Sequence, residues 1–278
     1  MPAPNTLSNT KSPRRWLSLF GWTRHSYVLL SVFFLTLFLI GYIWWPLAKE
    51  YLSYIDWHGS WWLYLDWLLL GIFFSMTLLI MAGADFRIDV KIILAGIIGG
   101  LAIESWGTQT NLWHYYTAER PPLWIIPAWP IASLAIDRVV RLLQRCLKCV
   151  KEKYFKTAYW LIFPAFLGLM ISFIVPTMDK SLTLCALIIV IYLLVTPSDH
   201  RMAVLTFMAG SGVGYFLERW GTTRECWTYY TYQTPPVFAV FAHGMAAVAF
   251  WRSVLLMNKV GNRMKQRLFP QSKPLSED

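Results

Sequence analysis

Apolar runs of nearly constant length recur along the whole chain. They are about 20 residues long, which is the length that an α-helix needs to cross the ~30 Å hydrocarbon core of a bilayer. Hydrophobic residues make up 56% of the 278 residues and charged residues only 14%, whereas about a quarter of a soluble domain is charged. The sequence therefore predicts an all-α polytopic membrane protein.

Eight segments are expected to be transmembrane helices. The first is too long for the core of a signal peptide, and no small-residue cleavage site follows it, so we expect it to be retained. The expected segments are about Tyr27–Ala48, Trp61–Met81, Val90–Trp106, Leu123–Leu142, Thr157–Pro176, Leu182–Val195, Met202–Trp220 and Val237–Met257.

The net charge of +10 is distributed unevenly between the two sides of these segments. With eight spans, 20 Lys and Arg residues fall on the side of both termini and 5 on the other side. The positive-inside rule then places both termini in the cytoplasm. Positive charge at the ends of apolar spans favours contact with lipid headgroups over nucleic acid, so membrane lipid is an expected partner and nucleic acid is not.

A motif at the end of the third segment recurs at the end of the seventh with every spacing kept. A constant shift of 114 residues maps one copy onto the other. The first copy contains Glu104, Trp106, Gly107, Thr108, Trp113, Tyr115, Tyr116, Thr117 and Pro121-Pro122. The second contains Glu218, Trp220, Gly221, Thr222, Trp227, Tyr229, Tyr230, Thr231 and Pro235-Pro236.

The repeat predicts two tandem four-helix units. An even number of spans in each unit gives both the same orientation, so we expect a pseudo-twofold axis along the membrane normal. Both motif copies then lie at the outer face. The expected organisation is a basic cytoplasmic tail (1–24), a first repeat (25–143), a basic linker (144–156), a second repeat (157–258) and a cytoplasmic tail (259–278).

Each motif glutamate follows two glycines at steps of four residues. Gly96, Gly100, Glu104 and Thr108 share one helix face, as do Gly210, Gly214, Glu218 and Thr222. Glycines at this spacing allow another helix to approach closely, so the carboxylates are expected to point into the bundle. An ionisable group within a span is a functional candidate, although a packing seam capped by an interfacial carboxylate would give the same pattern.

The aromatic residues of the motif keep their register in both copies, which an ordinary interfacial belt does not require. We therefore expect a folded loop, either re-entrant or a lid. Its expected ligand-binding residues are Trp106, Thr108, Trp113, Tyr115, Tyr116, Trp220, Thr222, Trp227, Tyr229 and Tyr230.

The two copies differ at a few positions. His114 is replaced by Thr228, and Trp129 by His243. His243 is either a packing residue or an acid/base partner of Glu218, so the predicted catalytic residues are Glu104, Glu218 and His243. No HxxxH or paired CxxC spacing accompanies them, and no metal is expected. The lone Cys146/Cys149 pair beside a span favours packing or acylation.

A glutamate at the end of an apolar span, followed by Gly-Thr and an aromatic-Tyr element, resembles the pattern of carotenoid hydratases and of the related lycopene-cyclase-like proteins. The resemblance covers residues 104–117 and 218–231, about a tenth of the chain. It implies carboxylates that protonate or hydrate an isoprenoid double bond, a role that would fall on Glu104 and Glu218. The doubled Trp-Gly-Thr and Tyr-Tyr-Thr elements depart from that pattern and leave the substrate undefined.

Three functions remain open at this point. The first is a plasma-membrane enzyme of hydratase, lyase or isomerase type that acts on a lipid or isoprenoid substrate. The second is a transporter or small-molecule-binding protein with its site between the repeats. The third is a scaffold in which the motif only packs the two halves. No cofactor is indicated by the residues.

Overall fold

The computed structural model describes residues 22–268, which are mainly helical. The predicted N-terminal tail lies almost entirely outside the described residues. Along the chain, the elements are α2 (Arg24–Ile43), α3 (Trp45–Ser53), η1 (Trp61–Tyr64), α4 (Trp67–Met81), α5 (Phe86–Gln109), β1 (Trp113–Tyr115), η2 (Leu123–Ile125), α6 (Ala128–Cys146), α7 (Glu152–Ile174), η3 (Val175–Thr177), α8 (Ser181–Val195), α9 (His200–Thr223), β2 (Trp227–Tyr229) and α10 (Val237–Leu268).

Four of these helical segments are long and apolar enough to cross a membrane, and two shorter apolar helices accompany them. The long segments are Arg24–Ile43, Leu123–Cys146, Glu152–Thr177 and Val237–Met264, and the shorter ones are Trp67–Met81 and Ser181–Val195. The expectation of an all-helical fold is confirmed, and among the described residues these helices are the candidates for membrane spans.

Every expected segment coincides with a helix, but several boundaries differ. The first expected span is broken at Trp44, because Pro46 in the first turn of α3 has no N–H for a bond to the preceding helix. The second begins only at Trp67, where the Asp66 carboxylate accepts a bond from the Leu69 N–H at 3.1 Å and so caps α4. The last helix continues to Leu268, well past Met257.

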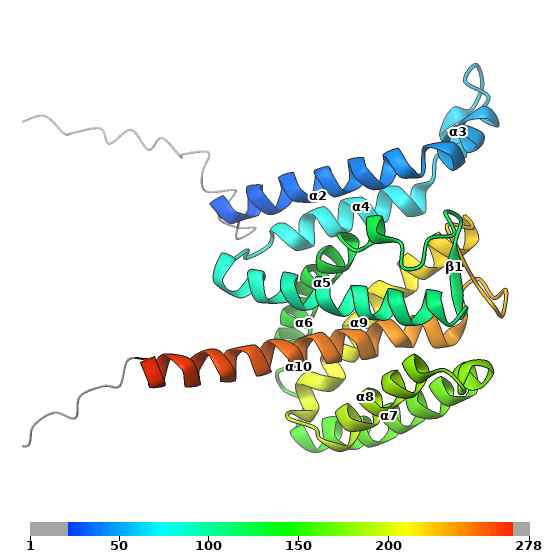
Figure 1. Ribbon diagram of the computed structural model, residues 1–278. Coiled ribbons are helices and arrows are strands. Elements are labelled where there is room, and N and C mark those ends of the chain that lie inside the picture. The colour runs from blue at the N-terminus through cyan, green and yellow to red at the C-terminus, as the bar shows by residue number, and fades with distance from the viewer. Residues whose placement is uncertain (1–21, 269–278) are drawn as a thin grey trace, which may run out of the picture.

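The helices form a bundle with four of them in the middle. Figure 1 shows α2 and α4 along one side and α7 and α8 along the opposite side, with α5, α6, α9 and α10 between these pairs. The start of α2 and the end of α10 lie at one end of the bundle, and β1 lies at the other (Figure 1). The strand β1 is therefore remote from the start of α2 and from the end of α10.

The predicted glycine seam lies inside this central group. A Cβ on Gly96 would lie 2.8 Å from the Pro130 Cα of α6, and one on Gly210 would lie 2.8 Å from the His243 carbonyl oxygen of α10. Real Cβ atoms do not approach backbone so closely, so only glycine permits these two helix crossings. The predicted close approach is confirmed in both halves.

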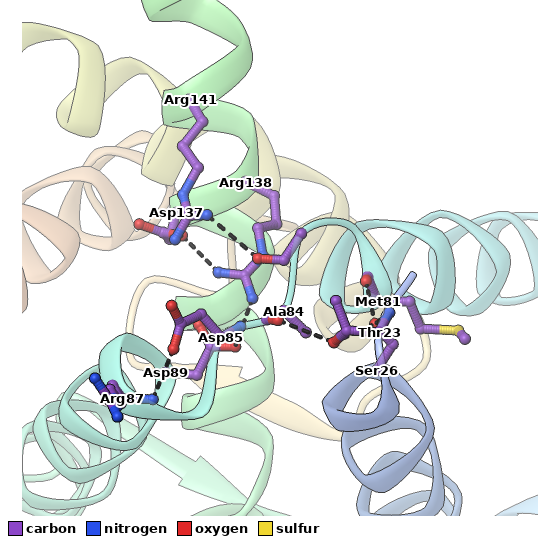
Figure 2. Close-up of polar contacts among 11 residues, drawn as sticks. Thr23, Ser26, Met81, Ala84, Asp85, Arg87, Asp89, Asp137, Arg138 and Arg141 are labelled. Atoms are coloured by element: carbon purple, nitrogen blue, oxygen red, sulfur yellow. Dashed lines mark hydrogen bonds and ion pairs between the residues drawn. The ribbon is translucent and has the colours of Figure 1, made fainter. Parts of the chain in front are cut away.

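A buried ion pair joins α5 and α6 at the end of the bundle where α2 begins. Arg138 Nη2 lies 2.8 Å from Asp89 Oδ2, and both side chains are almost fully buried. Figure 2 shows Asp137 with Arg138 and Arg141 beside this pair. Asp137 Oδ2 lies 2.6 Å from Arg138 Nη1 and 2.7 Å from Arg141 Nη2. Removing one partner of such a pair leaves an uncompensated buried charge, so the pair fixes how these helices pack at this end.

Candidate functional site

Both long helices of the motif begin and end in the same way. The carboxylates of Asp85 and Asp199 cap the first turns of α5 and α9. At the other end, the Leu112 N–H reaches the Gly107 carbonyl and the Cys226 N–H reaches the Gly221 carbonyl, each at 2.9 Å. Each of these bonds closes a six-residue turn, as in a Schellman motif. The motif turns the chain out of the helix toward the strand.

The two motif strands pair with each other. β1 and β2 form an antiparallel ladder in which Trp113 lies opposite Tyr229, and Tyr115 lies opposite Trp227. The ring centroids of each of these pairs are 5.8 Å apart. The loop is thus a folded element, as expected, but the strand pairing between its two copies was not predicted.

Glu104 is the centre of the first polar cluster. Its side chain is buried, with 3% of the residue exposed. Its Oε2 accepts a hydrogen bond from Trp113 Nε1 at 3.1 Å, and its Oε1 accepts bonds from the Tyr115 hydroxyl at 2.8 Å and from Trp129 Nε1 at 3.1 Å. Three donors compensate the carboxylate for the loss of water.

Glu218 is the centre of a matching cluster. It is 4% exposed. Its Oε2 accepts a bond from Trp227 Nε1 at 3.0 Å, and its Oε1 accepts one from the Tyr229 hydroxyl at 2.8 Å. The third partner is His243, whose Nε2 lies 2.9 Å from Oε1. An indole only donates, whereas an imidazole nitrogen donates or accepts, so only in the second cluster can the third partner share a proton with the carboxylate.

The third partners of the two clusters touch each other. The rings of Trp129 and His243 stack with centroids 5.6 Å apart and planes 18° apart. A continuous chain of contacts therefore runs from Glu104 through Trp129 and His243 to Glu218. The structure brings the three predicted catalytic residues into one connected group.

Glycines make room for this group. A Cβ on Gly107 or Gly221 would lie 1.9 Å from the ring of Trp113 or Trp227, respectively. Because both indoles pack directly against the helix backbone at these glycines, each is held in the position from which it donates to its glutamate.

The remaining expected ligand-binding residues have other contacts. Tyr116 donates to the Ile43 carbonyl of α2, and Tyr230 donates to the Phe173 carbonyl of α7. The hydroxyls of Thr108 and Thr222 each donate, at 2.6 Å, to the backbone carbonyl of the glutamate four residues before. His114, a predicted difference between the copies, is exposed on the strand and takes no part in either cluster.

The two motif tryptophans at the helix ends bind to the neighbouring helix pairs. Trp106 Nε1 donates to Thr183 of α8 at 3.1 Å, and Trp220 Nε1 donates to Asp66 of α4 at 2.8 Å. Asp66 also pairs with Arg224, with 3.0 Å between its Oδ2 and Arg224 Nε. The sequence carried no signal for Asp66 or Thr183, because the helix pairs that hold them have no recognisable repeat. Trp129, in contrast, was visible as the counterpart of His243.

A cavity of about 1100 Å³ lies beside both clusters, and its walls are mostly apolar. Its lining includes both glutamates and residues from all nine α-helices of the described chain. Its volume reaches the upper end of the ~300–1,000 Å³ typical of small-molecule sites. Cys226 forms part of the wall, where burial raises the pKa of its thiol to about 12. This thiol therefore stays protonated and is a poor nucleophile.

Within the described residues, no group of three or more His, Cys, Asp or Glu side chains is placed to hold a metal ion. The arrangement offers two carboxylates and an imidazole at the edge of an apolar cavity. Comparisons with protein-family models, with curated proteins and with solved structures found no match to this chain.

Proposed function

We propose that the chain forms eight transmembrane helices in two four-helix repeats related by a pseudo-twofold axis along the membrane normal. Both termini are cytoplasmic, and the strand pair lies at the outer face of the plasma membrane. Three observations support this topology: the matched glutamate clusters, the 24-residue lengths of α5 and α9, which correspond to about 36 Å, and the charge asymmetry of the sequence. A reporter fused after Asp278 that proves external would contradict it.

For the activity, we propose an acid–base enzyme that acts on an apolar isoprenoid of the carotenoid type. The observation that carries this proposal is that two buried carboxylates, one of them bonded to an imidazole, line one large apolar cavity. An apolar ligand would gain about 25 cal/mol for each Å² that it buries there. The local resemblance of the motif to carotenoid-modifying proteins points to the same substrate class.

The chemistry assigns different roles to the two clusters. A proton held between Glu218 and His243 is added to one carbon of a double bond, whose π electrons form the new C–H bond. Positive charge then develops on the neighbouring carbon. Glu104, whose carboxyl oxygens are held in place by three donors, stabilises that charge.

The reaction can end in two balanced ways. Loss of a proton from the next carbon to the Glu218–His243 pair gives an isomer without any co-reactant. Addition of water to the cationic carbon, with the surplus proton passing to the same pair, gives a tertiary alcohol. Both routes return the pair to a state that can act again.

The test is turnover of a linear isoprenoid polyene such as lycopene by the purified protein in a nonionic detergent. Chromatography with mass spectrometry distinguishes a product of unchanged mass from one that has gained a water. Glu104→Gln and Glu218→Gln are each expected to abolish turnover while the protein stays folded. Full activity in either variant would remove the proposed chemistry.

A transporter is the second candidate, because the cavity is lined by helices of both halves. On that view, the Glu218–His243 pair couples a proton to the movement of a ligand. Uptake into proteoliposomes that depends on a proton gradient, with no product formed from the polyene, would favour transport over catalysis.

A further inference from the structure

The cavity lining has a charge opposite to that of the chain as a whole. The sequence contains 25 Lys and Arg residues against 15 Asp and Glu. Yet the residues that line the cavity include five of the acids (Glu50, Asp66, Glu104, Glu218 and Glu225) and only one of the bases, Arg224. A basic protein thus concentrates acidic groups around this cavity.

Within the described part of the chain, only one of these acids is paired with a Lys or Arg side chain. Arg224 is already paired with Asp66, with 3.0 Å between Nε and Oδ2. Among residues 22–268, no Lys or Arg side chain forms an ion pair with the other four carboxylates. Glu104 and Glu218 are bonded instead to indole, phenol and imidazole groups. A bond from a neutral donor stabilises a carboxylate but leaves its formal charge in place.

Aromatic rings complete the wall. Six tryptophans line the same cavity: Trp44, Trp106, Trp113, Trp129, Trp220 and Trp227. The face of an indole attracts a cation more strongly than the faces of the other aromatic side chains do, and the attraction is stronger where water is excluded. Four of the six indole N–H groups donate to a carboxylate, so these rings and the negative charges are held next to each other.

We infer that the cavity selects for positive charge spread over a bulky apolar ligand. Dispersed charge suits it better than a compact ion, because a compact cation would lose its hydration among apolar walls. The inference deepens the proposed function, on which it rests for the identity of the site. The charge that develops on a protonated polyene is of this kind, and a permanently cationic apolar compound of similar bulk occupies the same space.

The test compares two ions of nearly identical shape and opposite charge. Tetraphenylphosphonium and tetraphenylborate are added separately to the full-length protein in a nonionic detergent, and binding is followed by quenching of tryptophan fluorescence. Empty micelles and micelles with free tryptophan correct for partitioning and for direct quenching. We expect saturable binding of the phosphonium and an affinity for the borate that is weaker by about tenfold or more.

Variants locate the selectivity. Glu104→Gln combined with Glu218→Gln is expected to weaken phosphonium binding by about tenfold and to reduce the preference over borate. Glu119→Gln, which changes an exposed acid outside the cavity lining, is the matched control and should bind as the wild type does. Retention of full phosphonium affinity in a folded double variant would overturn the inference.

If the double variant does not fold, the comparison of the two ions on the wild-type protein still tests the inference. Equal or tighter binding of the borate overturns the inference without reference to any substitution. The result is also separate from catalysis. Phosphonium binding without polyene turnover would remove the proposed enzyme and keep the cation site. Polyene turnover without charge selectivity would keep the proposed enzyme and remove the cation site.

Discussion

The clusters around Glu104 and Glu218 share two partners and differ in the third. In both, a tryptophan and a tyrosine from a paired strand donate to a buried carboxylate, at distances that agree within 0.1 Å. The third partner is an indole in one cluster and an imidazole in the other. The shared partners hold each carboxylate in a fixed position, and the third partner decides whether the carboxylate can share a proton with a neighbouring base.

The helix ends beside the clusters differ in a similar way. Trp106 donates to Thr183, which in turn donates to Thr177 at 3.0 Å, and both threonines are buried. The equivalent Trp220 donates to Asp66, which is paired with the half-exposed Arg224. One end is closed by neutral hydroxyls, whereas the other carries an ion pair at the cavity. The charged group therefore lies on the side of Glu218.

The largest expected effect concerns the glycines that make room for the indole in each of the two clusters. Gly107→Ala and Gly221→Ala each place a Cβ 1.9 Å from an indole ring, and such overpacking costs about 3 kcal/mol. Both variants should unfold at a clearly lower temperature in detergent, by similar amounts. Gly212→Ala, in the same helix as Gly221 but with nothing near its Cβ, should match or exceed the wild type. A large difference between the two alanine variants would break the equivalence of the halves.

The next prediction concerns the position at which the clusters differ. His243→Gln keeps a donor for Glu218 but removes the group that takes up and returns a proton. Turnover of the polyene should fall about 100-fold, which is at the lower end of general acid–base contributions. The thermal unfolding temperature should change little. His114→Gln alters an exposed histidine on β1 and serves as the control; a loss of similar size in both variants would contradict a specific role of His243 in proton transfer.

The smallest effect tests the shared tyrosines. Tyr115→Phe and Tyr229→Phe each remove one 2.8 Å bond to a buried carboxylate, which is expected to cost about 2 kcal/mol of folding free energy. Thermal unfolding should report nearly the same loss for both. Tyr42→Phe, on an exposed position of α2, should have no effect. A loss confined to Tyr229→Phe would show that only the second carboxylate depends on its tyrosine.

Much of the helical scaffold could be predicted from sequence because its causes are local. Apolar length marked the helices, and four-residue steps of glycine identified the faces on which α5 and α9 pack. These same steps predicted that Glu104 and Glu218 point inward. The break at Trp44 was also encoded locally, in Pro46, but within a continuous apolar run it was overlooked.

The arrangement of the site depended on contacts between distant segments. Nothing in either motif copy alone shows that Trp113 pairs with Tyr229, since strand pairing is set by where the two helix ends meet. Asp66 and Thr183 come from helix pairs whose sequences no longer match, so repetition could not indicate them. Whether the three predicted catalytic residues carry out chemistry remains a prediction.

The strand pair has a consequence for how such a chain can be assembled. His114 lies opposite Thr228, and these are equivalent positions of the repeat. An antiparallel ladder centred on equivalent positions is self-complementary, so two separate half-length chains would form it as a symmetric dimer interface. In such a homodimer both chains would have the same sequence, so the third hydrogen-bond partners of the two glutamates would have to be identical. Joining the halves in a single polypeptide is what allows an indole on one side to face an imidazole on the other.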